Sequence, residues 1–229
     1  MDNDDALALR LARDLDAAFP DLVTSHADRL YTIALRLLGN ASDAEEVAQD
    51  TLVRAHRAMA GYPSTRIAEL RLRPWLAAIA VNLARNRRRR ISDRHPADSI
   101  EPLVESGFDV RDDDRSDPPT TTLRRESAAE LAQLLLGLPP ALRSAVVLRH
   151  VDGLSVAETA AALGRPEGTV KAQVSRGLER LRTMLETGRR SDRAIAPPSR
   201  GRLRATTAAT PPRSDVMDGR LLMATEVLR

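Results

Sequence analysis

Residues 138–185 read LPPALRSAVVLRHVDGLSVAETAAALGRPEGTVKAQVSRGLERLRTML and decide the fold. The middle of this stretch predicts a short helix, a tight turn and a second helix. Ser155 and Glu158 have the spacing of a capping box, in which each side chain bonds an amide at the start of a helix. Gly164 stands where a helix commonly ends in a left-handed residue. The pattern is therefore typical of a helix-turn-helix.

The second of these helices has two unlike faces. Apolar residues recur at steps of three or four and predict a buried stripe, made of Val170, Val174, Leu178, Leu181 and Leu185. The opposite side carries small and cationic residues, among them Ala172, Ser175 and Arg176. Such a face suits a helix that lies in the major groove of DNA. A solvated amphipathic hairpin would show the same pattern, so this stretch alone leaves both readings open.

Composition favours helix packing for the whole chain of 229 residues. Hydrophobic residues make up 42% of it but aromatic residues only 2%, so Leu, Ala and Val must build the core. The net charge is +3 and the isoelectric point is about 10.1, which is compatible with binding to nucleic acid or to an anionic membrane surface. The absence of cysteine excludes disulfides, thiolate metal sites and cysteine nucleophiles.

Metal and membrane sites are not expected. The four histidines have no metal-ligand spacing, and each is interpreted as a surface or capping residue: His26, His56, His95 and His150. No apolar run approaches the roughly 20 residues of a membrane span. The acidic start, MDNDDALALR, lacks the order of a signal peptide. We expect a cytoplasmic protein with no membrane span, no metal site and no cofactor.

The amino-terminal part of the chain also has a helical period. An apolar face over residues 22–38 ends at Gly39-Asn40. Ser42 and Glu45 then repeat the capping-box spacing, which predicts the start of another helix.

That helix carries Glu46, Gln49 and Asp50 opposite its apolar side. A stripe of this kind is either plain solvated surface or a docking face for a basic partner, where charge sets the register of binding.

The next segment, residues 60–73, contains Gly61 and Pro63 and predicts a loop with one helical turn near residues 67–70. Pro74 is expected to open a helix in which Trp75 anchors the core. The helix ends in ARNRRRR, residues 84–90, and this density of arginine favours a phosphate-binding end over a merely soluble terminus.

Two polar segments have no helical period. Residues 91–122 are rich in proline, aspartate and glutamate, and predict a flexible acidic linker. Residues 188–229 are rich in proline, serine, threonine and arginine, and predict a disordered basic tail. We expect an all-α chain with five parts: a partly helical extension (1–21), a helical domain (22–90), the linker (91–122), a helix-turn-helix domain (123–187) and the tail (188–229).

The order of these parts resembles the extracytoplasmic-function (ECF) sigma factors, the smallest class of sigma-70-type initiation subunits of bacterial RNA polymerase. Four stretches carry the resemblance: DAEEVAQDTLVRAHRA (43–58), RPWLAAIAVNLARNRRRR (73–90), LPPALRSAVVLRHVDGLSVAETAAALG (138–164) and GTVKAQVSRGLERLR (168–182). It covers residues 22–185. The resemblance implies that residues 22–90 are region 2, which binds the polymerase and opens the −10 element, and that residues 123–187 are region 4, which reads the −35 element.

The resemblance also implies roles for individual residues. The residues expected to dock on the clamp of the largest polymerase subunit are Glu46, Gln49 and Asp50. The residues expected to contact −10 DNA are Tyr62, Ser64, Arg66, Asn82, Arg85, Asn86 and Arg88. The residues expected to contact −35 DNA are Arg165, Thr169, Lys171, Ala172, Ser175 and Arg176. The family often has more aromatic residues in its −10 region, where this chain has only Tyr62 and Trp75.

The expected partners are core RNA polymerase, promoter DNA and an anti-sigma factor. The chain is expected to direct promoter-specific initiation without chemistry of its own. A free-standing helix-turn-helix regulator explains residues 138–185 equally well, but not the acidic stripe or the linker. An enzyme such as a DNA recombinase is disfavoured because the sequence has no glycine-rich phosphate loop and no metal-ligand cluster.

Overall fold

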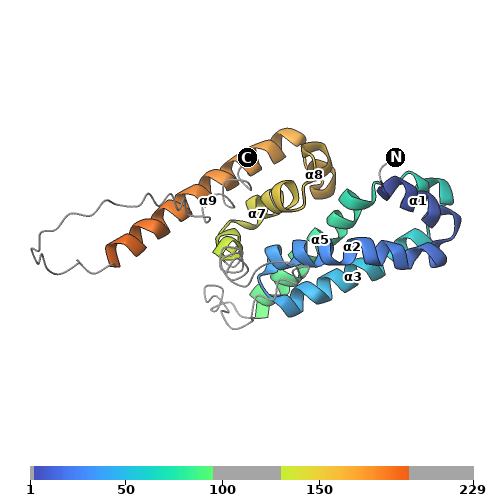
Figure 1. Ribbon diagram of the computed structural model, residues 1–229, viewed down its shortest axis with the longest axis horizontal. Coiled ribbons are helices and arrows are strands. Elements are labelled where there is room, and N and C mark those ends of the chain that lie inside the picture. The colour runs from blue at the N-terminus through green and yellow to red at the C-terminus, as the bar shows by residue number, and fades with distance from the viewer. Residues whose placement is uncertain (1–2, 95–129, 196–229) are drawn as a thin grey trace, which may run out of the picture.

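The computed structural model describes residues 3–94 and 130–195, and every regular element in those ranges is helical (Figure 1). The prediction of an all-α fold is confirmed. The predicted linker and tail fall mostly outside the described residues. The labelled elements are α1 (Asn3–Arg13), α2 (Leu15–Leu38), α3 (Ala41–Ala60), α4 (Ser64–Ala68), α5 (Leu72–Arg94), α7 (Pro140–Val146), the π-helical turn η1 (Val147–Val151), α8 (Val156–Leu163) and α9 (Glu167–Ile195). Residues 130–136 form a further helix before α7.

The elements form two groups that lie side by side (Figure 1). In the amino-terminal group, α2 packs against α3 and α5, and α1 packs against α2 and α4. In the carboxy-terminal group, α7 and α8 pack against α9. Within the described part of the chain, no helix is long and apolar enough to cross a membrane.

The junction between α2 and α3 shows how local sequence sets helix ends. Gly39 ends α2 with a φ of 78°, in the left-handed region that glycine tolerates best. The cap of α3 is Asn40, whose side-chain oxygen accepts a hydrogen bond from the Asp43 amide at 2.9 Å. The expected capping box of Ser42 and Glu45 is wrong, because asparagine is as good a cap as serine and stands two residues earlier.

Replacing Asn40 with alanine should therefore lower the free energy of unfolding by about 1 kcal/mol, because the Asp43 amide loses its acceptor. Ser42→Ala is the matched control and should change that free energy by less than about 0.5 kcal/mol. Urea unfolding followed by circular dichroism measures both. A larger loss for Ser42→Ala than for Asn40→Ala would restore the capping box as the true helix start.

Three other boundaries differ from the prediction. Helix α4 covers Ser64–Ala68, earlier than the turn expected at residues 67–70, and α5 begins at Leu72 because the first turn tolerates Pro74 without an amide donor. Helix α5 continues through residues 91–94, which were assigned to the linker.

Helix α9 similarly continues to Ile195, beyond Gly188 where the tail was expected to begin. One glycine inside a helix costs only about 1 kcal/mol relative to alanine, and that is too little to stop a long helix.

The helix-turn-helix is formed as predicted. The Ser155 hydroxyl accepts from the Glu158 amide and the Glu158 carboxylate accepts from the Ser155 amide, which completes the capping box of α8. These bonds lower the pKa of Glu158. Gly164 ends α8 with a φ of 61°. Gly177 lets α9 cross α7 closely, since a Cβ there would lie 2.5 Å from the Val146 side chain.

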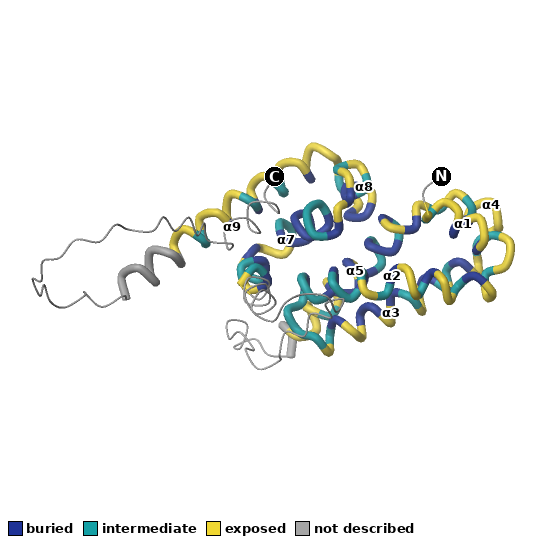
Figure 2. Tube along the Cα trace, in the orientation of Figure 1, coloured by how far each residue is buried: buried dark blue, intermediate teal, exposed yellow. Residues whose placement is uncertain are grey.

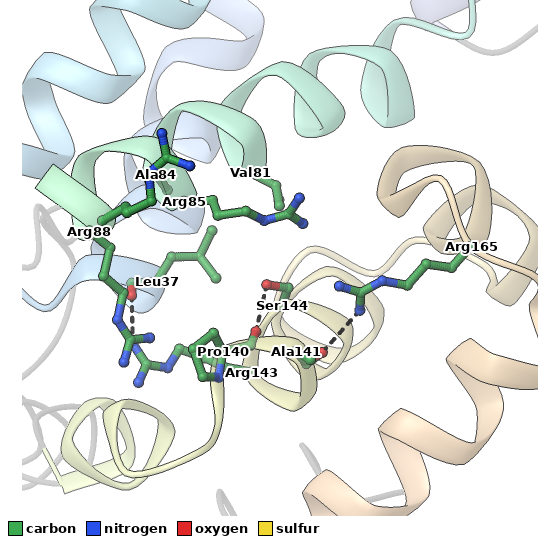
Figure 3. Close-up of a pocket in the computed structure, with 11 residues that line it drawn as sticks. Leu37, Val81, Ala84, Arg85, Arg88, Pro140, Ala141, Arg143, Ser144 and Arg165 are labelled. Atoms are coloured by element: carbon green, nitrogen blue, oxygen red, sulfur yellow. Dashed lines mark hydrogen bonds between the residues drawn. The ribbon is translucent and has the colours of Figure 1, made fainter. Parts of the chain in front are cut away.

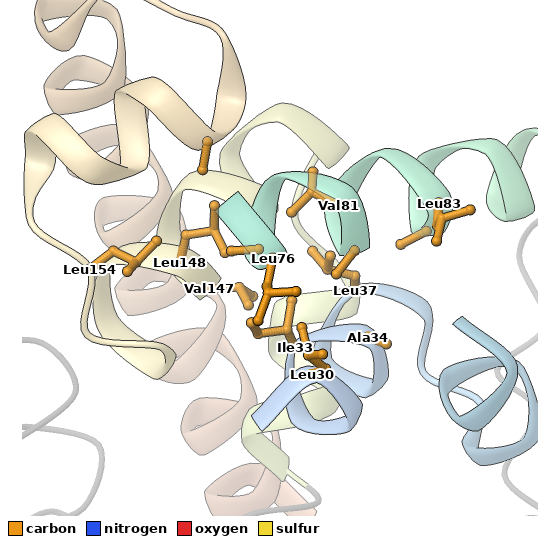
Figure 4. Packing of buried hydrophobic residues seen from close by; sticks show 14 of the residues in the cluster. Leu30, Ile33, Ala34, Leu37, Leu76, Val81, Leu83, Val147, Leu148 and Leu154 are labelled. Carbon is orange, nitrogen blue, oxygen red and sulfur yellow. The ribbon is translucent and has the colours of Figure 1, made fainter. Parts of the chain in front are cut away.

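The two groups share one hydrophobic core (Figures 2 and 4). Figure 4 shows Leu76 of α5 beside Ile33 of α2 and Val147 of η1. Leu76 and Val147 are fully buried. Burial of apolar surface therefore holds the described helices of the two groups together in this arrangement.

Polar contacts reinforce this junction. The Arg29 guanidinium pairs with both carboxylate oxygens of Asp152, each at 2.5 Å, although the two residues lie 123 positions apart in the chain. The Asp152 side chain is completely buried. Arg73 donates to the Asp152 carbonyl at 2.8 Å, and Arg143 donates to the Leu37 carbonyl at 2.7 Å. We call the Arg29–Asp152 pair the junction ion pair.

Candidate nucleic-acid interface

The acidic stripe of α3 lies on the surface. Glu46, Gln49 and Asp50 are exposed, whereas Val47 and Ala48 between them are buried. The helix period therefore separates a core face from a polar face, as the sequence predicts.

One arginine of α5 ties that helix to the stripe. Arg87 pairs with Asp43 and also with Glu46, whose carboxylate lies 2.7 Å from its nitrogen. The hydrogen bond to Asp43, which is its strongest contact, raises the pKa of Arg87. Asp50 makes no ion pair with any residue in the described ranges. It is thus available to an external cation.

The predicted −10 residues form two separate patches. The first surrounds Tyr62, which is half-buried with its ring 6.3 Å from the Trp75 ring. The Arg66 guanidinium lies 3.7 Å from the centre of the Tyr62 ring in a cation–π contact, and Ser64 is exposed nearby in the chain. Trp75 is also only half-buried, so it is less of a core anchor than expected.

The second patch lies farther along α5. All four of its residues are exposed: Asn82, Arg85, Asn86 and Arg88. Trp75 and Arg88 are thirteen positions apart, which at a rise of 1.5 Å per residue is about 20 Å along the helix. The first patch therefore lies near the start of α5, and the second begins at the middle of that helix, at Asn82.

The predicted −35 face of α9 is exposed as its period requires. The exposed residues are Thr169, Lys171, Ala172, Ser175 and Arg176. Arg176 folds back so that its Nε donates to the Ala172 carbonyl at 3.2 Å. Lys171 and Ser175 also border a groove of about 620 Å³, to which Arg149 contributes. Arg149 borders the same groove, although it was not among the residues predicted to contact −35 DNA.

Arg165 differs from the other predicted −35 residues because it faces the amino-terminal group. It is half-buried and donates to the Gln173 side chain at 2.7 Å. Figure 3 shows it at one wall of a cavity, with Arg85 and Arg88 of α5 at another. The structure thus brings predicted −10 and −35 residues to a single cavity.

The sequence analysis did not anticipate one buried cation and one buried imidazole among the described residues. Arg143 is 3% exposed, and burial, assisted by the nearby charge of Arg88, lowers its pKa to about 10. A lone arginine within the apolar run ALRSAVV is the signal that sequence reasoning overlooked. His26 is 3% exposed, which corrects its assignment to the surface, and burial lowers its pKa.

Comparison with known proteins decides the family. Sigma-70 region 2 matches residues 22–94, and Sigma-70 region 4 matches residues 128–181. The ECF RNA polymerase sigma factor SigW of Bacillus subtilis is 32% identical over 171 residues, which are 73% of this chain and 89% of SigW. The chain belongs to the ECF sigma factors.

Two further relatives agree with this assignment. The ECF sigma factor SigE of Mycolicibacterium smegmatis is 38% identical over 179 residues, which are 74% of this chain but only 63% of SigE, less than two thirds of its length. The structure of CnrH in complex with the cytosolic domain of CnrY has a TM-score of 0.59 at 25% identity and covers 81% of this chain and 99% of that one. This sigma factor is an RNA polymerase subunit of the class that directs transcription initiation, a class generally without catalysis of its own.

In this sigma factor, the region 2 match includes most of α2 and all of α3, α4 and α5. The region 4 match includes α7, η1 and α8 with most of the exposed face of α9. The junction ion pair therefore joins region 2 to region 4.

Proposed function

We propose that this ECF sigma factor docks on core polymerase through Glu46, Gln49 and Asp50, and contacts −10 DNA through the two patches of region 2. Region 4 reads −35 DNA with the exposed face of α9. The sigma factor acts in the cytoplasm and leaves phosphodiester chemistry to the polymerase. The observation that carries the proposal is the coexistence of an exposed acidic face on α3 and an exposed small and cationic face on α9.

Promoter binding requires regions 2 and 4 to separate. The names of the −10 and −35 elements place them about 25 base pairs apart, roughly 85 Å at 3.4 Å per base pair. Arg85 and Arg165, which are assigned to different elements, line one cavity here. We therefore assign the arrangement in Figure 1 to a closed form of the sigma factor. An anti-sigma factor is a candidate partner for this form.

The function is tested by transcription from a library of genomic promoter fragments with core polymerase and the purified chain. Start sites that depend on the chain and share −10 and −35 sequences support the proposal. Transcripts at background level across the library would disprove it. A tight complex with duplex DNA in the absence of polymerase would instead indicate a free-standing regulator.

Asp50→Arg should weaken binding to core polymerase by about tenfold or more, because it places a positive charge against the basic surface of the polymerase, which repels it. Fluorescence anisotropy of labelled sigma factor against core polymerase measures the affinity. Glu186→Arg makes the same charge change at an exposed position of α9 and should have little effect. Equal losses for the two variants would show that net charge, and not the stripe, governs docking.

Arg176→Ala should cost about 1–3 kcal/mol of discrimination at one −35 base pair, because arginine bridges O6 and N7 of guanine. The measurement is competition among promoter variants that each differ at a single −35 position. A uniform loss across all variants would assign Arg176 to a phosphate contact.

A further inference from the structure

The cavity between regions 2 and 4 is lined by arginines from both (Figure 3). It has a volume of about 400 Å³. Arg85, Arg88 and Arg89 come from α5, Arg143 from α7, and Arg165 from the turn before α9. Within residues 3–94 and 130–195, no acidic side chain contributes to the lining. The described part of the chain therefore gathers several cations at this cavity and no compensating carboxylate.

The arginines of α5 in this cavity have no partner within the described residues. The guanidinium groups of Arg85, Arg88 and Arg89 make no hydrogen bond or ion pair there. Arg87 of the same helix differs, because Asp43 and Glu46 neutralise it. The absence of carboxylates is thus specific to the side of α5 that faces region 4.

Two cations also face one another across the junction: Arg88 of α5 and Arg143 of α7. The buried Arg143 donates to the carbonyls of Leu37, Leu136 and Leu138, and its Nε has no acceptor in the described chain. Carbonyls accept hydrogen bonds but carry no net negative charge. The positive charge of the guanidinium is therefore not neutralised. With a pKa of about 10, it remains a cation at neutral pH.

Arg85 of α5 and Arg165 of region 4 form a second pair of like charges across the junction. Burial lowers the pKa of Arg165, and the charge of Arg85 lowers it further. Bringing arginines of region 2 against arginines of region 4 costs electrostatic energy that an anion between them would remove. The cavity has a positive field from two walls, which attracts and concentrates anions.

We propose that this cavity binds a compact polyphosphate anion, either inorganic polyphosphate or the phosphate chain of a nucleotide. Guanidinium groups match phosphate oxygens with paired, charge-assisted hydrogen bonds. The volume lies in the range of small-molecule sites and admits several linked phosphates, whereas a DNA duplex is too wide to enter. Leu37, Val81 and Ala84 supply an apolar wall beside the arginines.

Such an anion would bridge regions 2 and 4. It contacts Arg88 on one side and Arg165 on the other only while the two regions are packed together. Its binding therefore stabilises the closed form by mass action. If the proposed function holds, the anion also slows promoter binding, and this consequence alone rests on that proposal.

Isothermal titration calorimetry of the full chain with sodium tripolyphosphate, in the absence of DNA and polymerase, tests the site. Arg88→Ala and Arg165→Ala should each weaken binding by about tenfold or more, because each removes a charged contact from one wall. Arg90→Ala is the matched control: it removes an exposed arginine of α5 that does not line the cavity, and should change the affinity less than twofold. Circular dichroism verifies the fold of each variant.

A second titration uses GTP in place of tripolyphosphate. Equal affinities support recognition of the phosphate chain alone, and tighter binding of GTP supports a nucleotide whose base lies on the apolar wall. No heat from either anion at millimolar concentration overturns the proposal. So does an equal loss for Arg88→Ala and Arg90→Ala, or no loss for Arg165→Ala. Because neither titration contains promoter or polymerase, a failed transcription assay leaves this test unaffected.

Discussion

Replacing Arg29 with alanine is expected to destabilise the packing of region 2 against region 4 by about 3–5 kcal/mol, because it strands a buried carboxylate. Asp152 has no exposed side-chain surface, and both of its oxygens face Arg29 at 2.5 Å. Arg71→Ala is the matched control. Its ion pair with Glu158 also crosses the junction, but Arg71 is 77% exposed, so its loss should cost less than about 1 kcal/mol.

The loss of stability caused by Arg29→Ala should depend on pH. Burial raises the pKa of Asp152 above its usual 3.8, and Arg29 opposes that rise. Without Arg29 the folded pKa moves higher still. A raised carboxyl pKa contributes stability below the unfolded pKa, and this contribution is lost as the pH rises through the folded pKa. Urea unfolding should therefore show the largest deficit at neutral pH and a smaller one at about pH 4.

A double variant separates the charge effect from general damage. Arg29→Met combined with Asp152→Leu removes both charges and should recover most of the stability, since a buried ion pair is often replaceable by apolar residues. The chain has no cysteine, so Val53→Cys and Ala172→Cys give a specific spin-label pair. Arg29→Ala should lengthen and broaden the distance between the labels. An unchanged distance distribution and an unchanged unfolding curve would show that the junction ion pair does not hold the closed form.

Local sequence was enough to predict most of the helices and which faces of α3 and α9 are exposed. The capping box of Ser155 and Glu158 and the left-handed Gly164 are formed as predicted, because caps depend on residues three or four positions apart. The same reasoning failed where two good caps compete: Asn40 and Ser42 both suit a helix start, and only the three-dimensional contacts select one.

The contacts between the two regions could not be predicted from local sequence patterns. Arg29 and Asp152 belong to different family regions, and neither stands in a spacing that indicates its partner. The family resemblance assigned Arg165 to −35 DNA, yet it also lines the cavity against α5. Side-chain periodicity shows which face of a helix is buried. It does not show whether that face meets its own region or the other one.

Leu76→Ala should lower the free energy of unfolding by about 2–5 kcal/mol, because the lost side chain leaves a cavity that the junction cannot fill. Leu76 is completely buried, and Figure 4 shows it between α2 and η1. Ile91→Ala is the control on the same helix: Ile91 is 42% exposed, and its removal should cost less than about 0.5 kcal/mol.

The two junction variants should differ in kind. Leu76 also packs within region 2, so its loss should weaken that region in both the closed and the open form and reduce transcription. Arg29→Ala mainly removes a contact between regions, so it should favour the open form and leave transcription equal or higher. Thermal unfolding together with transcription from a cognate promoter measures both effects. If Leu76→Ala and Arg29→Ala reduced transcription equally, the junction would have to be part of the active form, and the closed form would not be an inactive one.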